Sequence, residues 1–174
     1  RGPQLHIPNR VIEEVFVEYF IKVLKENNIE ADSIRVDTGV TELLNTGDIS
    51  IITNEVSKLL AKMSNRDFMN FDEKCIKSLY IGLIHNDGFE VYSEYPANSG
   101  YIDLLLRRKG ILGNYDIMIE LKYLKKSNRK LLESKRVEAI EQLKRYSQDE
   151  RINKPDLKKY AIIFIGSDYK IYEV

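Results

Sequence analysis

The chain has 174 residues, 43% of them hydrophobic and 31% charged, with 27 basic and 27 acidic side chains. This composition predicts one sizeable folded domain, or one core with an added helical lobe, and it excludes a disordered chain. No apolar run approaches the roughly 20 residues of a membrane helix, and no signal-peptide pattern opens the sequence, so we expect a cytoplasmic protein. The chain begins at Arg1 and not at methionine, which suggests a fragment of a longer protein.

The first third of the sequence predicts a helical lobe. Apolar residues recur at helical spacing from Val11 to Leu24, which indicates a long amphipathic helix. A second, short helix is expected over residues 41–45, and a third should follow the N-cap Asp48 and continue to about Met63. Nothing in this lobe suggests chemistry, because it has no glycine-rich phosphate loop.

From residue 72 onward the pattern alternates between helix and strand periods. The predicted elements, in order, are a helix over 72–85, strands over 89–94, 100–106 and 116–123, a helix over 133–146, and strands over 160–165 and 169–174. In the first helix Glu73 lies one turn before Lys77, a favourable helical pair. In the second, we expect four residues to pack inward: Val137, Ile140, Leu143 and Tyr146.

Two of these strands carry charged residues in the middle of apolar runs. Asp103 lies in the first, and Glu120 and Lys122 lie in the second, with glycines and an asparagine in the connection between them. Side chains alternate across a strand, so Glu120 and Lys122 must share a face, and antiparallel pairing should bring Asp103 close to them. Buried charges are costly unless they are paired, bind a metal or face a cleft. A structural charge cluster is the alternative.

The positive charge is concentrated just after these strands. Residues 121–160 contain 13 Lys or Arg against 6 Asp or Glu, although the whole chain is neutral. Lys125, Lys126, Arg129 and Lys130 form the densest part of this segment. A phosphodiester substrate would be bound by such cations beside carboxylates that hold a metal. By itself, however, a basic segment is more often only a solvated surface.

The arrangement of these residues resembles the PD-(D/E)XK nuclease superfamily. The motif consists of a helix with Glu73, a strand with Asp103, the strand sequence Glu120-Leu121-Lys122, and a following helix with Gln142 and Tyr146. The sequence is also similar to the nuclease-like C-terminal region of bacterial proteins that carry an upstream AAA-ATPase-like domain. Two departures are Tyr101 where relatives commonly have arginine, and the absence of the proline of the superfamily's name.

The resemblance implies an α/β fold with a restriction-endonuclease-like core, in which a mixed sheet is flanked by helices in the order α-β-β-β-α-β-β. It implies a helical lobe over residues 1–68 and a nuclease-like domain over residues 69–174. It further implies a magnesium- or manganese-dependent nuclease of nucleic acid, with DNA favoured over RNA. The competing interpretation is a non-catalytic module that binds nucleic acid or a partner and serves an ATPase-like domain.

The resemblance also assigns roles to individual residues. Asp103, Glu120 and the backbone carbonyl of Leu121 would hold the cation, because hard oxygen ligands suit magnesium. Lys122 would position or help deprotonate the attacking water and stabilise negative charge in the transition state. Glu73 would orient a metal-bound water or help to hold a second cation. Gln142 would support the site, and Tyr146 would pack there or contact the substrate backbone. The basic segment Lys125, Lys126, Arg129 and Lys130 would contact nucleic acid. Glu94 is a weaker acidic candidate, because nothing fixes the side of the strand on which it lies.

Overall fold

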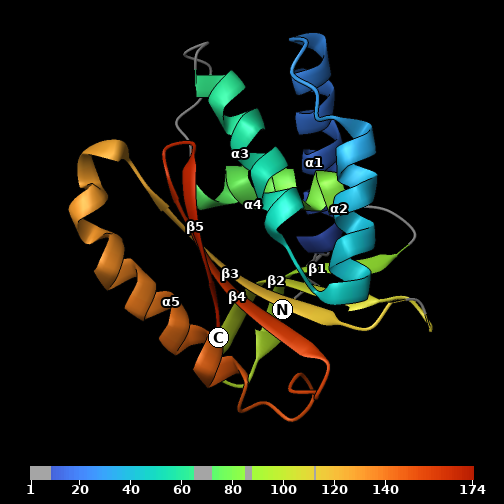
Figure 1. Ribbon diagram of the computed structural model, residues 1–174, viewed down its shortest axis with the longest axis vertical. Helices are drawn as coiled ribbons and strands as arrows, with labels where there is room; N and C mark the ends of the chain where they lie inside the picture. Colours follow the sequence, from blue (N-terminus) through green and yellow to red (C-terminus); the bar gives the residue numbers. More distant parts are fainter. Residues whose placement is uncertain (1–8, 65–71, 85–87, 112) are drawn as a thin grey trace, which may run out of the picture.

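The computed structural model of the chain describes residues 9–64, 72–84, 88–111 and 113–174 (Figure 1). The described elements in chain order are α1 (Asn9–Glu26), α2 (Ser33–Thr46), α3 (Ser50–Ser64), α4 (Glu73–Ile84), β1 (Phe89–Ala97), β2 (Gly100–Arg108), β3 (Asp116–Leu124), the 3-10 helix η1 (Lys126–Leu131), α5 (Leu132–Tyr146), β4 (Leu157–Ile165) and β5 (Asp168–Glu173). From α4 onward this is the predicted order α-β-β-β-α-β-β, with η1 added. Within the described residues, no helix is long and apolar enough to cross a membrane.

The five strands form one mixed sheet in the order β1-β2-β3-β4-β5. Neighbouring strands are antiparallel except β3 and β4, which run parallel because α5 carries the chain across one face of the sheet between them. The helices α1 to α4 cover the opposite face (Figure 1). The sheet therefore lies between α5 on one side and the N-terminal helices on the other.

The two faces of the sheet have separate cores. The larger core joins α1 to α4 with the apolar side chains of β2, β3 and β4 that point toward them, such as Leu104, Ile119 and Phe164. The smaller core packs Leu143 and Tyr146 of α5 against the other face. The inward packing predicted for Val137 is wrong, because 46% of this residue is exposed on the outer side of α5.

The second helix is much longer than the sequence predicts. It begins at Ser33, where the carboxylate of the N-cap Asp32 accepts a hydrogen bond from the backbone N–H of Arg35. It ends at Thr46, and the C-cap Gly47 adopts the left-handed conformation. Threonine, valine and glycine have low helix propensity, which obscures this helix in the sequence. Its packing on α3 explains the glycine within it, since a Cβ at Gly39 would lie 2.8 Å from Cγ2 of Ile51. Tertiary packing thus stabilises a helix that propensity disfavours.

The other N-terminal helices follow the prediction closely. The first ends at Glu26, and the third begins at Ser50, whose backbone N–H donates to the carboxylate of Asp48 at 2.8 Å. Residues 1–8 lie outside the described part of the chain.

Near Asp103, the side chains of the β1–β2 hairpin no longer alternate regularly between the two faces of the sheet. The register pairs Ser93 with Leu104 and Tyr95 with Ile102, but Glu94 and Asp103 between them are not paired. Glu94 has a φ of 49°, in the left-handed region. Both Leu105 and Ile102 contact the α5 core although they are three residues apart, so strict alternation fails between them. The side chain of Asp103 lies within this irregular part of β2, so strand alternation does not determine its direction.

Candidate active site

The β2–β3 ladder opens where the predicted charged residues lie. The pairing ends at Leu104 and Ile119, so Asp103 and Glu120 would form the next pair but are not in the ladder. Beyond this point, the carboxylate of Asp103 accepts a hydrogen bond from the backbone N–H of Leu121 at 2.8 Å. The side chain replaces the missing backbone partner and fixes Asp103 beside the Glu120-Leu121-Lys122 segment. The predicted proximity of the two strands' charges is confirmed.

Glu120 and Lys122 form a buried ion pair on the face of β3 toward α5. The ammonium of Lys122 donates to Oε1 of Glu120 at 2.9 Å, and the two residues are only 6% and 2% exposed, respectively. The predicted common face of these residues is therefore confirmed. Glu138 of α5 lies 3.7 Å from the same ammonium and also binds Lys135 at 2.7 Å. Lys122 is thus held between a buried and a half-exposed carboxylate.

The two carboxylates of this cluster repel each other. Burial, and then the nearby charge of Asp103, raise the pKa of Glu120 to about 7 against the attraction of Lys122. Burial likewise raises the pKa of Asp103, although the Leu121 N–H opposes it. Burial lowers the pKa of Lys122, but Glu120, Glu73 and Asp103 outweigh it, so the pKa of Lys122 is raised and the ammonium stays charged. The cluster has one more negative group than its lysine can neutralise.

A second set of charges approaches the same point from α4. The carboxylate of Glu73 accepts a hydrogen bond from the backbone N–H of Tyr123 at 3.2 Å, which places it beside β3. Lys77 does not pair with Glu73 as predicted; its ammonium forms a short ion pair with Glu94 of β1 instead. Glu73 thus lies near the cluster, whereas Lys77 and Glu94 extend it toward the edge strand.

Gln142 and Tyr146 lie beneath the cluster on α5. Tyr146 is 3% exposed, and burial followed by the charge of Glu120 raises the pKa of its hydroxyl, which is hydrogen-bonded to Gln142. A Cβ on Gly100 would lie 3.4 Å from the Tyr146 ring, so the β1–β2 hairpin packs closely on it. A ring buried in this way favours packing over direct contact with nucleic acid. Oε1 of Gln142 is buried, and no described residue hydrogen-bonds to it.

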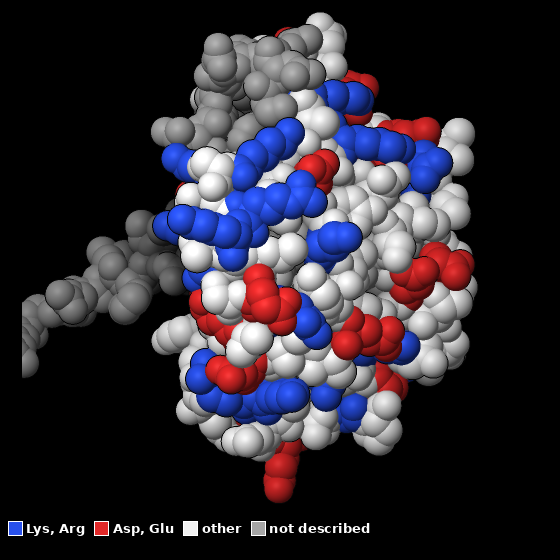
Figure 2. Space-filling model, turned by 60° about the vertical axis from the view of Figure 1, so that its left-hand side comes forward, with Lys and Arg blue, Asp and Glu red and all other residues white. Residues whose placement is uncertain are grey.

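The basic segment forms the exposed η1 turn beside the site. None of its residues is buried, and it joins the end of β3 directly to α5. Figure 2 shows the face that carries η1 and α5: Lys and Arg side chains gather in its upper part, at the height of η1 in Figure 1, while the lower part mixes both signs. Lys125, Lys126, Arg129 and Lys130 are therefore accessible to an anionic ligand, as a binding role requires.

Three charged residues near the site were ranked low or overlooked in the sequence. Glu94 was a weak candidate, because its left-handed backbone cannot be read from strand alternation. Lys77 had a signal in its position one turn after Glu73, and Glu138 had one in its position one turn before Gln142. Helical spacing could have indicated both, but their partners lie on other elements.

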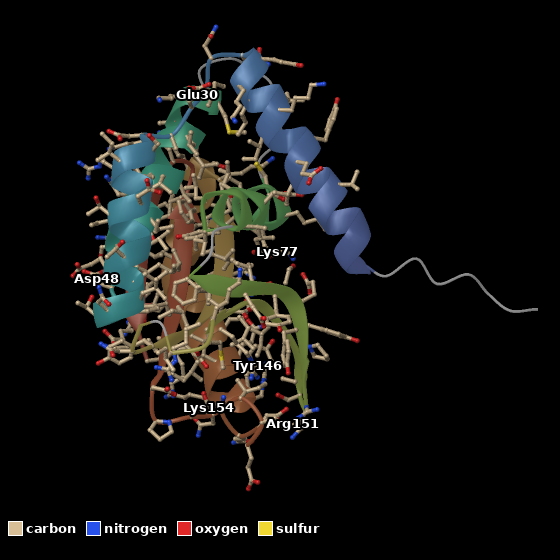
Figure 3. The ribbon with its side chains drawn as sticks, turned by 90° about the vertical axis from the view of Figure 1, so that its right-hand side faces the viewer. Glu30, Asp48, Lys77, Tyr146, Arg151 and Lys154 are labelled. Atoms are coloured by element: carbon tan, nitrogen blue, oxygen red, sulfur yellow. The ribbon has the colours of Figure 1, made fainter. Side chains whose placement is uncertain are left out.

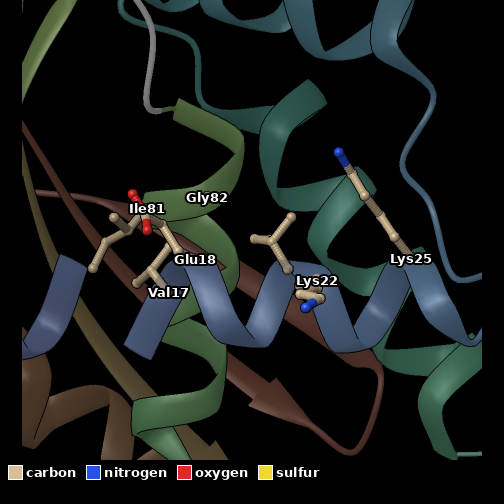
Figure 4. Close-up of a pocket in the computed structure, with 7 residues that line it drawn as sticks. Val17, Glu18, Lys22, Lys25, Ile81 and Gly82 are labelled. Carbon is tan, nitrogen blue, oxygen red and sulfur yellow. The ribbon is translucent and has the colours of Figure 1, made fainter. Parts of the chain in front are cut away.

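A groove elsewhere on the molecule is distinct from this cluster. It has a volume of about 580 Å³ and lies between α1 and α4, where Ile21 packs closely over Gly82. Figure 4 shows the charged side chains of Glu18, Lys22 and Lys25 along α1 at its edge. None of the residues predicted for catalysis lines it. The groove therefore gives no support to the site on β2 and β3.

The donor atoms of the cluster fit a hard divalent cation. Oε2 of Glu120 is buried, and no group in the described part of the chain hydrogen-bonds to it. An orphaned carboxylate oxygen beside a second carboxylate is the kind of ligand that magnesium prefers. The same described residues contain no group of three or more Asp, Glu, His or Cys side chains that could hold a metal. A cation would thus have two protein carboxylates, with backbone carbonyl and water oxygens completing its shell.

Comparison with known protein families agrees with this geometry. Residues 71–174 match the family model described as PD-(D/E)XK nuclease superfamily. The match covers more than half of the chain, from the start of α4 to the last strand, so the chain belongs to this superfamily. The mixed five-stranded sheet flanked by helices is consistent with its restriction-endonuclease-like fold, as predicted. A search of curated proteins found no match.

Proposed function

We propose that the protein is a magnesium- or manganese-dependent nuclease that hydrolyses phosphodiester bonds at the Asp103–Glu120–Lys122 cluster. One observation carries the proposal: two carboxylates meet where the β2–β3 ladder opens, and one buried oxygen of Glu120 has no hydrogen-bond partner among the described residues. Membership of the PD-(D/E)XK superfamily supports the reaction class. A purely structural cluster would be expected to satisfy this oxygen.

Asp103, Glu120 and the carbonyl of Leu121 would hold the cation. The bound cation would supply positive charge to the scissile phosphate and lower the pKa of a bound water. The Leu121 N–H fixes one oxygen of Asp103, and Lys122 fixes one oxygen of Glu120, so the remaining oxygens are positioned in advance. Glu73, whose carboxylate is hydrogen-bonded to the backbone N–H of Tyr123 in β3, would orient a water molecule near the cation.

Lys122 would act as a cation and not as a base. Because its pKa is raised above the ordinary value, the ammonium keeps its proton near neutral pH. A protonated lysine beside the reacting phosphate stabilises the negative charge that develops in the transition state and can orient the attacking water. Of the two roles expected from the sequence, charge stabilisation is the one this environment favours.

Nucleic acid is the substrate that the surroundings of the site suit best, and we place DNA ahead of RNA. The exposed cations Lys125, Lys126, Arg129 and Lys130 lie directly after β3 and could bind the phosphate backbone. We assign residues 69–174 to the nuclease-like domain and residues 1–68 to a helical lobe. We further propose that the protein acts in the cytoplasm, next to an ATPase-like domain upstream in the same protein.

A non-catalytic module for binding nucleic acid or a partner is the second candidate. The observation in its favour is that Lys122 already forms a buried ion pair with Glu120 and needs no metal to be neutralised. Such a module would bind nucleic acid without a divalent ion and would leave it intact.

A cleavage assay distinguishes the two candidates. The full chain is incubated with labelled single-stranded and duplex DNA and RNA, with magnesium, with manganese or with a chelator. The nuclease requires cleavage that stops with the chelator and in Asp103→Asn. Binding without cleavage under every metal condition would support the module instead. Replacing Lys125, Lys126, Arg129 and Lys130 together should lower the salt dependence of binding, and an unchanged salt slope would limit this basic segment to solvation.

A further inference from the structure

Lys77 is a nearly buried cation on the α4 side of the candidate site. It is 8% exposed, and its ammonium forms an ion pair with Glu94, whose side chain is 51% exposed. Figure 3 places Lys77 between α4 and β1. The aliphatic part of Lys77 is therefore packed in the protein, while its charged end is held by a residue at the surface.

The partner of Lys77 sits at the distorted point of the β1–β2 hairpin. Glu94 lies opposite Asp103 in register, but neither joins the ladder, and Glu94 has a φ of 49°. A left-handed conformation is unfavourable for a residue with a Cβ, and such strain is concentrated at functional sites. Burial raises the pKa of Asp103, and the charges of Lys122 and Lys77 both lower it, so Lys77 acts on the same carboxylate as Lys122 does.

The site thus has two lysines, each tethered to a glutamate that water reaches. Lys122 contacts Glu138 of α5, whose side chain is 45% exposed, and Lys77 contacts Glu94 of β1. The charge of a half-exposed carboxylate is screened by water, so its hold on a lysine is weak. A phosphate brings more negative charge and can replace such a carboxylate as the partner of the lysine.

We propose that Lys77 is a second phosphate-binding lysine, which contacts a phosphate next to the scissile one, and that Glu94 holds its ammonium in place until a nucleic-acid strand binds. The inference rests on the proposed nuclease function and adds a substrate contact to it. Lys122 would contact the reacting phosphate from the α5 side. Lys77 would contact the adjacent phosphate from the α4 side, so that the nucleic-acid strand crosses the open end of β2 and β3.

The test compares Lys77→Met, Lys77→Arg, Glu94→Gln and the double variant Lys77→Met/Glu94→Gln. Binding of a fluorescein-labelled DNA oligonucleotide to the full chain is measured in chelator over a series of salt concentrations. We expect Lys77→Met to weaken binding about fivefold to tenfold and to reduce the salt slope by about 0.7–0.9. Lys77→Arg should stay near the parent, and Glu94→Gln should tighten binding because it frees the ammonium.

The double variant separates a local contact from a general charge effect. It has the same net charge as the parent, so a long-range field alone predicts unchanged binding, whereas loss of the Lys77 contact predicts weaker binding. Lys158→Met and Glu173→Gln are the matched controls, since these residues form an ion pair at 2.5 Å between β4 and β5. With magnesium present, Lys77→Met should raise KM with little change in kcat.

The outcomes distinguish this inference from the proposed function. If the parent cleaves DNA but Lys77→Met and Glu94→Gln both behave like the controls, or both weaken binding, the role of Lys77 is overturned and the nuclease stands. If the parent neither binds nor cleaves any nucleic acid, the proposed function fails and this inference fails with it. If Lys77→Met does not fold in thermal melts, Glu94→Gln decides, because only the proposed role predicts binding tighter than that of the matched control Glu173→Gln.

Discussion

Strands β2 and β3 have a charge cluster at each end, and the two clusters differ in how completely their polar atoms are paired. At the end where the chain connects β2 to β3, the carboxylate of Asp116 accepts a hydrogen bond from the backbone N–H of Arg108 at 3.1 Å. The Arg108 guanidinium also pairs with Asp156 and donates to the carbonyl of Gly113. At the open end, Asp103 and Glu120 compete for Lys122. Both clusters contain two carboxylates and one cation.

The difference lies in how completely each cluster is satisfied. The guanidinium of Arg108 offers several donors in a fixed geometry, and it pairs with both Asp116 and Asp156. The ammonium of Lys122 is a compact point charge, and one oxygen of Glu120 has no partner in the described residues. Buried charge alone therefore does not indicate a functional site. A buried polar atom that has no hydrogen-bond partner is the better indication.

The largest expected effect is on cleavage. Lys122→Ala should reduce kcat about 1000-fold, because it removes the cation that faces the developing charge, while magnesium still binds. Single-turnover cleavage and calorimetric magnesium titration measure the two properties. An Arg108→Lys variant, altered at the structural end, is the control and should keep kcat within about tenfold if it folds. Cleavage by Lys122→Ala at the parent rate would place catalysis elsewhere.

The second prediction compares the stability of matched aspartate variants in chelator. Asp116→Asn should lower the free energy of unfolding by about 3 kcal/mol, because it breaks the ion pair of a buried aspartate and leaves the partner cation Arg108 less well satisfied. Asp103→Asn should equal or exceed the parent, because it relieves repulsion with Glu120 and keeps an acceptor for the Leu121 N–H. Urea unfolding measures both.

Magnesium should sharpen this contrast. A ligand that binds only the folded state raises its stability, so magnesium should stabilise the parent and Asp116→Asn but not Asp103→Asn. The contrary outcome is a large loss of stability in Asp103→Asn together with no stabilisation of the parent by magnesium. It would show that the Asp103 cluster is a structural salt bridge like the Asp116 cluster.

The last prediction concerns the pH dependence of stability without metal. The pKa of Glu120 is raised to about 7 in the folded state, whereas in the unfolded chain it has its ordinary value of 4.5. The folded state therefore holds this proton more tightly, so the contribution is full below pH 4.5 and is lost as the pH rises through about 7. Relative to Glu120→Gln, the parent should lose about 3 kcal/mol over this range. Thermal melts at a series of pH values measure this. If the melting temperatures of parent and variant change with pH in parallel, the assignment is contradicted.

The sequence predicted the order of elements from α4 onward and the common face of Glu120 and Lys122. These features depend on periods of 2 and 3.6 residues, which a short segment displays by itself. It also predicted that Asp103 would approach them, since an antiparallel pair follows from two strands and a glycine-containing connection. Helix α2 and the exposure of Val137 were predicted wrongly, because packing against α3 stabilises α2 and only the docked position of α5 decides which residues face the sheet.

The details of the site were decided by tertiary structure. Asp103 binds the backbone of Leu121, 18 residues away, because the ladder stops there, and Lys77 reaches Glu94, 17 residues away, because β1 turns out of regular alternation. Glu138 reaches Lys122 only because α5 lies across that face of β3. Each contact joins different elements, and its geometry depends on how the elements pack. A local sequence pattern specifies which charges are available, whereas packing specifies which of them remain unsatisfied.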